Sequence, residues 1–173
     1  MLEYNPYNAD ERSGFMEKDG CCFTGHRTIP EGYDSLLSDL LRSTVRELYL
    51  HDGIKTYYVG GAQGFDTLAA MTVLEARESF PEIRLVVVLP YANQVDRWSA
   101  ADEVICLADR YYTGCMFVRN RYLVDHSSLC VSYQTKQTGG TAYTVKYALK
   151  KGVKVINLAD VVKTRNEGDS QKN

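Results

Sequence analysis

The sequence predicts an α/β protein, a Rossmann-like three-layer sandwich with a mostly parallel central sheet. Short apolar runs alternate with segments whose apolar residues recur at helical spacing, and glycine-rich turns follow several of the runs. The run Arg84–Pro90 has a continuous apolar centre, which is typical of a parallel strand covered on both faces. A repeated strand–helix–strand pattern requires right-handed crossovers, so we expect the strands to run parallel.

The first half of the chain contains two short strands and two helices. Cys21–Thr24 is an apolar run that ends at a glycine, and Thr56–Val59 is a second run that leads into a pair of glycines. Tyr33–Leu50 has apolar residues at helical spacing, and the glycine that follows is suited to end a helix. Phe65–Phe80 is a second helix, which the next residue, a proline, stops.

The second half continues the alternation after the strand at residues 84–90. Gln94–Ala108 and Val118–Asp125 are expected to be helices. Leu129–Ser132 is a strand, and Thr141–Lys150 is a helix with a glycine behind it. Val153–Asn157 is the final strand.

The length of 173 residues fits one compact domain. Residues 1–20 show neither helical nor strand spacing of apolar residues and are expected to form an N-terminal arm. Residues 164–173 are expected to form a polar C-terminal tail. The Rossmann-like domain is therefore expected to span residues 21–163.

Charge and composition restrict the function classes. The formal net charge is -2 and the pI about 5.9, which argues against a nucleic-acid partner held by a broad basic face. No apolar run approaches the roughly 20 residues that span a bilayer, and residues 1–20 lack the apolar centre of a signal peptide. We therefore expect a cytoplasmic protein without a membrane partner.

The five cysteines are odd in number and form no C-x-x-C pair, so we interpret them as buried free thiols. Neither a metal site nor a resident cofactor is expected. Some of the 13 tyrosines could build a dimer face, which leaves a homo-oligomer open.

The most informative motif follows the second strand. Gly60 and Gly61 close the strand, and Gly64 opens the next helix, so backbone N–H groups can approach an anion at a helix N-terminus. Asp66 could cap that helix or accept a hydrogen bond from a ribose hydroxyl. The spacing is neither the dinucleotide G-x-G-x-x-G pattern nor a Walker loop, so it favours neither a nicotinamide cofactor nor ATP hydrolysis by that route.

A second glycine-rich loop opens the last long helix. Gly139, Gly140 and Thr141 follow a strand, and the threonine hydroxyl could cap the helix or hold a phosphate oxygen. Two such loops at strand ends in one small domain indicate an anion or nucleotide pocket more strongly than either alone.

Three further candidates come from strand ends and nearby helices. Arg27 could bind a phosphate, whereas His26 beside it is more typical of a hydrogen-bonded structural residue than of a catalyst. Trp98, the only tryptophan, could stack on a base or anchor the core. Arg119 and Arg121 are too close in sequence to share a helix face, so one of them is expected to point into a given site.

Five segments in this order resemble the YpsA-like branch of the SLOG superfamily, which groups SMF/DprA proteins with Lonely Guy phosphoribohydrolases. They are FTGHR, YVGGAQGFDTLAA, LPYANQVDRW, RNRYLVDHSSL and TGGTAYTVKYA. The resemblance covers about residues 21–160. It implies a Rossmann-like fold with a nucleotide pocket over the two glycine loops, and it implies that Arg119 is the counterpart of the Lonely Guy arginine.

The same resemblance leaves the activity open. The Lonely Guy motif P-G-G-x-G-T-x-x-E ends in a glutamate, and Thr144 stands at that position here. Cleavage of an N-glycosidic bond needs an acid/base carboxylate, for which Asp66 or Asp125 would have to substitute. We therefore expect a sensor or carrier of a nucleotide-like ligand, with an N-glycosidic hydrolase using Arg119 and Asp66, or a DprA-like single-stranded DNA binder, as alternatives.

The residues expected to bind the ligand lie in the four strand-end segments and on the helix before the last glycine loop. They are Thr24, Gly25, His26, Arg27, Gly60, Gly61, Ala62, Gln63, Gly64, Asp66, Pro90, Tyr91, Gln94, Trp98, Arg119, Gly139, Gly140 and Thr141.

Overall fold

A computed structural model describes residues 19–170 and contains one six-stranded parallel sheet. The strands are β1 (Gly20–Gly25), β2 (Thr56–Val59), β3 (Arg84–Leu89), β4 (Glu103–Cys106), β5 (Leu129–Tyr133) and β6 (Lys154–Asn157). The helices are α1 (Asp34–Asp52), α2 (Phe65–Ser79), the 3-10 helix η1 (Val95–Trp98), α3 (Cys115–Asp125), α4 (Gly140–Lys150) and α5 (Leu158–Ser170).

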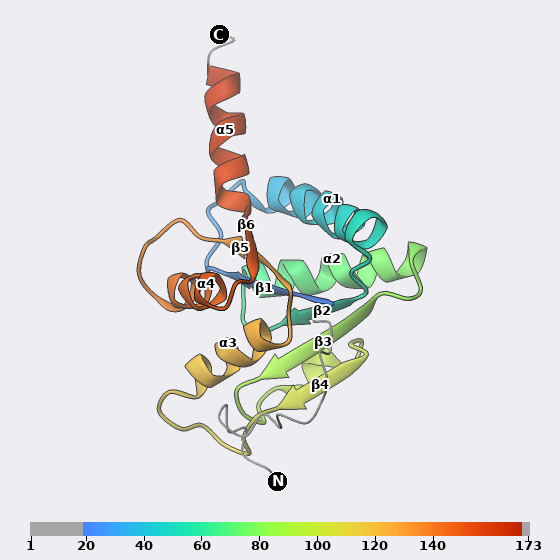
Figure 1. The fold of residues 1–173 in the computed structure, drawn as a ribbon, viewed down its shortest axis with the longest axis vertical. Helices are drawn as coiled ribbons and strands as arrows, with labels where there is room; N and C mark the ends of the chain where they lie inside the picture. The colour runs from blue at the N-terminus through green and yellow to red at the C-terminus, as the bar shows by residue number, and fades with distance from the viewer. Residues whose placement is uncertain (1–18, 171–173) are drawn as a thin grey trace.

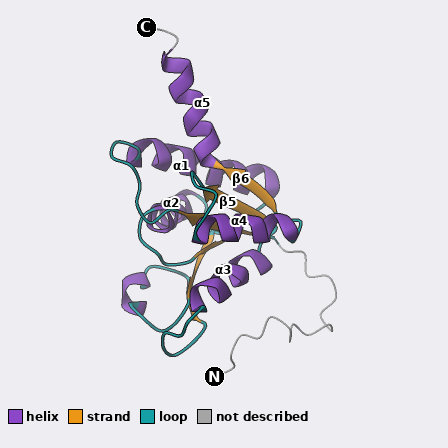
Figure 2. Ribbon diagram, turned by 90° about the vertical axis from the view of Figure 1, so that its left-hand side faces the viewer, coloured by secondary structure: helices purple, strands orange, loops and turns teal. Residues whose placement is uncertain are grey.

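The sheet lies between two layers of helices, as the sequence predicts (Figures 1 and 2). Helices α1 and α2 pack together on one face, where α5 also contacts α1, and α3 and α4 pack on the other face. The strand β3 shows why both faces are covered. Leu85 and Val87 join the core cluster below α1 and α2, whereas Val86 and Val88 join the cluster below α3 and α4.

The strand order is β4-β3-β2-β1-β5-β6, so the chain reverses its direction of growth between β1 and β5. Thr24 pairs with Ser132 and Gly25 with Tyr133 along this boundary. In open α/β sheets, ligands bind outside the carboxyl ends of the strands near such a reversal. The fold therefore directs attention to the loops that follow β1, β2, β3 and β5.

The helix predicted over Gln94–Ala108 is wrong. The segment forms only the short 3-10 helix η1 and then the edge strand β4, which pairs with β3. The carboxylate of Asp102 accepts a hydrogen bond from the N–H of Leu85 at 2.8 Å and another from Arg77 at 2.8 Å. These contacts fix the chain beside the start of β3, so the next four residues continue as a strand.

Two boundaries differ from expectation by three residues or more. Helix α3 begins at Cys115, three residues before the predicted start, after Gly114 at φ +92°. Helix α5 runs to Ser170 and so includes most of the expected polar tail; it is held at its start by the buried Leu158 and Val162. Residues 1–18 of the expected arm and residues 171–173 lie outside the described part of the chain. Within that part, no helix combines the length and the apolar character needed to cross a membrane.

Candidate functional site

A polar pocket of about 260 Å³ lies at the carboxyl ends of β2 and β3, and we call it the strand-end pocket. It is lined by Arg27, Gly60, Gly61, Ala62, Gln63, Leu89, Pro90, Tyr91, Asn93, Gln94, Arg97, Trp98, Met116 and Arg119. These residues come from the loop after β1, the first glycine loop, the β3–η1 segment and the first turns of α3.

The first glycine loop packs so closely that side chains larger than hydrogen do not fit. A Cβ on Gly60 would lie 2.4 Å from Nη1 of Arg119 and 2.9 Å from Oδ2 of Asp66. A Cβ on Gly64, whose φ is +72°, would lie 2.3 Å from the backbone oxygen of Arg27. The loop is therefore clamped between α3 on one side and the β1 loop on the other, which fixes its position in the pocket wall.

Arg119 is the buried cation of the pocket. Its side chain is 7% exposed; its Nε donates to Oδ1 of Asn120 at 2.8 Å, and its Nη1 donates to the backbone oxygen of Gly60. Burial lowers the pKa of Arg119, although the neighbouring Asp66 carboxylate opposes that shift. The pKa of an arginine is high enough that the group stays charged, so Arg119 holds a positive charge in the wall of the pocket.

Asp66 lies behind the glycine loop, and it is not part of the pocket lining. It is buried, and its Oδ2 accepts a hydrogen bond from the N–H of Ala62 at 3.3 Å. Burial raises the pKa of Asp66, while Arg119 and the loop N–H groups act in the opposite direction. The carboxylate thus braces the loop and balances part of the arginine charge.

Two more arginines face the pocket. Arg97 donates through Nη2 to the hydroxyl of Thr67 at 3.1 Å and lies over the ring of Trp98, 5.1 Å from its centroid. Arg27 completes the set from the β1 loop. None of the described lining residues carries a carboxylate, so the strand-end pocket is strongly cationic even though the whole chain is not.

The wall that packs against Gly61 of the glycine loop is apolar and aromatic. Leu89, Trp98 and Tyr91 form it, and Trp98 is 7% exposed, so it anchors the core and lines the pocket at once. Gln94 in the same wall has φ +54°, the one positive φ among residues 19–170 outside glycine. Such strain is retained where surrounding structure imposes it, and it clusters at functional sites.

The second glycine loop does not line the strand-end pocket. Gly139 has φ +92° with open space around its Cα, and a Cβ on Gly140 would come no nearer than 3.9 Å to Nδ2 of Asn120. Thr141 is buried, and Thr144 donates its hydroxyl to the backbone oxygen of Gly140 at 2.8 Å. The position aligned with the Lonely Guy glutamate is therefore occupied by a hydroxyl that is used within α4.

His26 contacts the segment that precedes the second glycine loop, and it does not line the pocket. Its Nε2 accepts a hydrogen bond from the N–H of Thr135 at 3.0 Å, and its ring lies edge-on to Tyr133. Burial, with a smaller contribution from Lys136, lowers the pKa of His26 and favours the neutral ring that this acceptor role requires.

The structure brings together part of the expected ligand site. The pocket lining contains Arg27, Gly60, Gly61, Ala62, Gln63, Pro90, Tyr91, Gln94, Trp98 and Arg119. Outside the lining are Thr24, Gly25, His26, Gly64, Asp66, Gly139, Gly140 and Thr141. Gly25 lies under the ring of Phe65, where a Cβ would come within 2.4 Å, so it is a packing glycine.

Sequence reasoning missed Leu89, Asn93, Arg97 and Met116. Arg97 stands in the motif LPYANQVDRW, directly before the only tryptophan, and that pairing was a usable signal. Among the side chains that the structure describes, no group of three or more His, Cys, Asp or Glu residues is arranged to hold a metal ion. The three arginines of the pocket can bind and orient an anion.

A Rossmann-like α/β domain with a cationic pocket at its strand ends is the class of protein that the fold and the geometry define. Within that class, the chain belongs to the YspA SLOG family, whose model matches residues 33–163. This finding confirms the resemblance given by the five sequence motifs.

Relatives of the chain occur in bacteria. The UPF0398 protein of Halalkalibacterium halodurans is 28% identical over 117 residues, which are 59% of this chain and 62% of that protein. The uncharacterized SPbeta prophage-derived protein YoqJ of Bacillus subtilis is 28% identical over 138 residues, 66% of this chain and 81% of YoqJ. The chain thus spans less than two thirds of the UPF0398 relative.

Solved structures confirm the fold. DNA processing protein A (DprA) of Streptococcus pneumoniae matches with a TM-score of 0.60 and 15% identity, over 79% of this chain and 48% of that one. DprA of Helicobacter pylori, described with its single-stranded DNA binding mode, gives 0.57 and 16%, over 82% and 67%. The molybdenum cofactor binding protein of Rippkaea orientalis gives 0.55 and 19%, over 89% and 87%.

Proposed function

We propose that the chain binds a nucleotide or nucleotide-derived ligand, with the ligand's phosphate in the strand-end pocket. The observation that carries the proposal is the convergence of Arg27, Arg97 and Arg119 on the first glycine loop, without a carboxylate among the described lining residues. Guanidinium groups bind phosphate oxygens through paired, charge-assisted hydrogen bonds.

The aromatic wall supports a nucleotide over a simple inorganic anion. Tyr91 offers a partly exposed ring beside the arginines, with the buried Trp98 behind it, and stacking on such a ring holds a base without reading its identity. The pocket therefore combines the two recognition elements that a nucleotide needs, a charged end and a planar end.

Sensing or carrying is better supported than hydrolysis. An N-glycosidic hydrolase of the Lonely Guy kind needs a carboxylate at the reacting bond. Thr144 stands at the glutamate position, and Asp66 is committed to bracing the loop behind the pocket. Arg119 is also hydrogen-bonded, to Gly60 and Asn120. Asp66 and Arg119 therefore hold the shape of the site.

Binding of single-stranded DNA is the second candidate. Two of the fold neighbours are DprA proteins, and the Helicobacter pylori structure concerns single-stranded DNA binding. The local cluster of arginines could contact a backbone phosphate despite the net charge of -2. Such binding would weaken steeply with added salt.

The test uses Trp98 as an intrinsic probe, because it is the only tryptophan and lines the pocket. Fluorescence titrations compare adenosine, adenosine monophosphate and adenosine diphosphate. Arg84→Ala is the matched control for Arg97→Ala, since Arg84 lies at the opposite end of β3. We expect the phosphate-bearing ligands to bind at least tenfold more tightly than adenosine, and Arg97→Ala to weaken them by about 10- to 100-fold, as loss of a charged hydrogen bond implies.

Equal binding of adenosine and its phosphates, or an Arg97→Ala variant that binds like the control, would contradict the proposal. Chromatography of the incubated ligand separates the alternatives, because free base would indicate a hydrolase. Quenching by a short oligonucleotide alone, lost at high salt, would favour the DNA candidate.

A further inference from the structure

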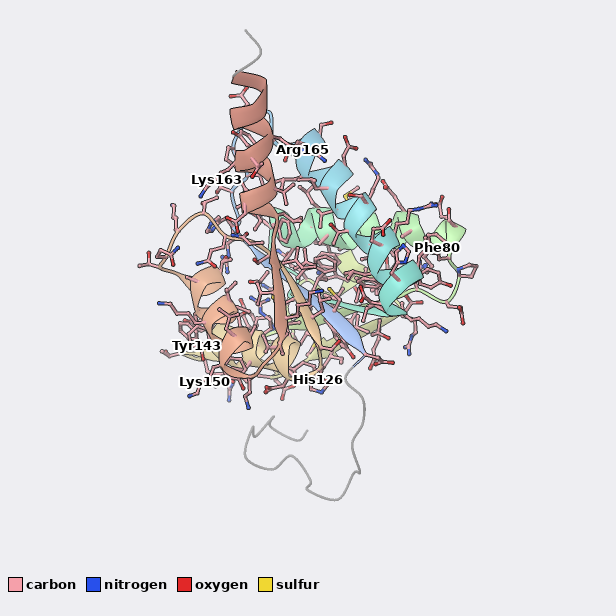
Figure 3. All side chains as sticks on the ribbon, turned by 45° about the horizontal axis from the view of Figure 1, so that its top comes forward. Phe80, His126, Tyr143, Lys150, Lys163 and Arg165 are labelled. Atoms are coloured by element: carbon pink, nitrogen blue, oxygen red, sulfur yellow. The ribbon has the colours of Figure 1, made fainter. Side chains whose placement is uncertain are left out.

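A second hollow of about 490 Å³ lies between α3 and α4, and we call it the α3–α4 groove. Its walls are Tyr112 and Phe117 from the α3 side and Tyr143 from α4, with Arg121 between them. Figure 3 marks Tyr143 on α4. None of these four residues lines the strand-end pocket.

The groove presents aromatic rings to solvent. Phe117 is 46% exposed and Tyr112 44% exposed, although rings of this size are usually covered. Phe117 meets Tyr143 edge to face, with 4.7 Å between ring centroids and 68° between their planes. An arrangement of this kind leaves ring faces free to stack on a further flat ring.

Arg121 gives the groove a cation. Its Nη1 donates to the hydroxyl of Tyr143 at 3.0 Å. Its Nε is enclosed and has no hydrogen-bond acceptor among the residues that the structure describes. A small movement of the guanidinium toward an incoming acceptor would therefore break no bond at Nε, and a ring with nitrogen or oxygen acceptors would complement it.

The groove and the strand-end pocket share a wall. Met116 and Arg119 of α3 line the pocket, whereas Phe117 and Arg121 of the same helix line the groove. At about 100° per residue, these two pairs point to opposite sides of the helix. The two hollows are linked along the chain. The ring of Tyr91 in the pocket meets that of Tyr111 edge to face, with 5.8 Å between centroids, and the next residue, Tyr112, lines the groove.

The strand-end pocket and the α3–α4 groove differ in volume. Pockets that enclose a whole ligand commonly measure about 300–1,000 Å³. The strand-end pocket at about 260 Å³ is below that range, whereas the groove at about 490 Å³ is within it. The pocket therefore has room for phosphates, and the groove on the other side of α3 has room for an aromatic ring.

We infer that the α3–α4 groove is a second subsite for a planar aromatic ring, and that the ligand is of the dinucleotide class, two nucleosides joined through their phosphates. The phosphates lie among the arginines of the strand-end pocket, and the second base stacks on the exposed ring of Phe117, beside Tyr143 and Arg121. This inference rests on the proposed function, which supplies the phosphate site.

The test compares diadenosine diphosphate with adenosine diphosphate as probes, again by Trp98 fluorescence. We expect the wild-type protein to bind the dinucleotide about tenfold more tightly, as one extra stacked base implies. Phe117→Ala should reduce dinucleotide affinity to that of adenosine diphosphate and leave the latter within twofold. Phe117→Tyr should restore the difference, and Met71→Ala, which removes a similarly exposed side chain from α2, should leave both affinities unchanged.

Equal affinity of the two probes for the wild-type protein would overturn the second subsite, as would a Phe117→Ala variant that weakens both alike. If adenosine diphosphate binds in an Arg97-dependent way but the dinucleotide gains nothing, the subsite fails while the proposed function stands. If neither probe binds, the proposed function fails with it. Self-association in sedimentation that Phe117→Ala abolishes and Met71→Ala retains would assign the groove to a second copy and also overturn the inference.

Discussion

The two glycine-rich loops look alike in sequence, but they differ in what surrounds them. In the first, a Cβ on Gly60 or Gly64 would come within 2.4 Å of Arg119 or Arg27. In the second, Gly139 is required by its φ of +92°, and Gly140 has open space on the side of its missing Cβ. The first loop therefore combines tertiary contacts with positive φ angles at Gly61 and Gly64, whereas in the second loop Gly139 shows the backbone requirement and neither Gly139 nor Gly140 has the close contacts.

This difference shows that two separate physical requirements, close packing and a positive φ, can select glycine at a strand end. Close approach brings other groups to the loop, and only the first loop lies among arginines as a result. A backbone turn alone brings nothing with it. The contrast leads to predictions that rank the loops by the effect of changing them.

The largest effect is expected from Arg119→Met. The change would leave the buried carboxylate of Asp66 without its neighbouring cation and the Gly60 oxygen without its donor. Removing one member of a buried charge pair costs about 3–5 kcal/mol, so the free energy of unfolding in urea should fall by that amount. Adding Asp66→Asn should restore part of the loss, and a decrease below about 1 kcal/mol would mean that Arg119 does not hold the first loop.

Matched alanine substitutions should separate the loops by a smaller margin. Neither Gly60 nor Gly140 has a positive φ, so the comparison isolates steric contact. Gly60→Ala should lower the free energy of unfolding by about 1–3 kcal/mol through overpacking. Gly140→Ala should raise it by about 0.4–1 kcal/mol, because alanine restricts the unfolded chain. Equal effects in urea denaturation would contradict the distinction between packed and open loops.

The smallest effects concern pH, and the two loops should respond with opposite sign. Burial raises the pKa of Asp66 above its ordinary 3.8, so the folded state binds more protons and stability falls as pH rises from 3.8 through the raised value. Burial lowers the pKa of His26 below its ordinary 6.5, so its contribution is complete above pH 6.5 and is lost as pH falls through the lowered value.

Urea denaturation across both pH windows measures these contributions. Asp66→Asn should flatten the dependence in the acidic window alone, and His26→Gln the dependence just below neutrality. A His26→Gln variant that keeps the wild-type dependence near neutrality would show that the contact between His26 and Thr135 does not sense pH.

Much of the fold was predictable because its signals are local. The apolar centre of β3 and the helical spacing of α1 are complete within short windows of sequence. The edge strand β4 was not predictable, because four residues are too few to show a strand-like alternation of apolar and polar side chains. Its position also depends on the hydrogen bond between Asp102 and Leu85. Local pattern cannot show a contact across seventeen residues.

The candidate site divides in the same way. Gly60, Gly61, Trp98 and Arg27 were identified from motifs near strand ends, and they line the pocket. The sequence could not show that His26 bonds to Thr135, more than a hundred residues away, because that contact exists only after β1 and β5 pair. The second glycine loop lies outside the pocket for the same reason, because its position depends on long-range packing.

The most direct measurement of the difference between the loops is a titration of ¹⁵N-labelled protein with adenosine diphosphate, followed by amide chemical shifts in NMR spectra. If the phosphate binds in the strand-end pocket, the largest changes will fall on Gly60, Gly61, Ala62 and Gln63, with small ones at Gly139–Thr141. Large changes at Gly139–Thr141 with an unaltered first loop would contradict the assignment and move the phosphate to the start of α4.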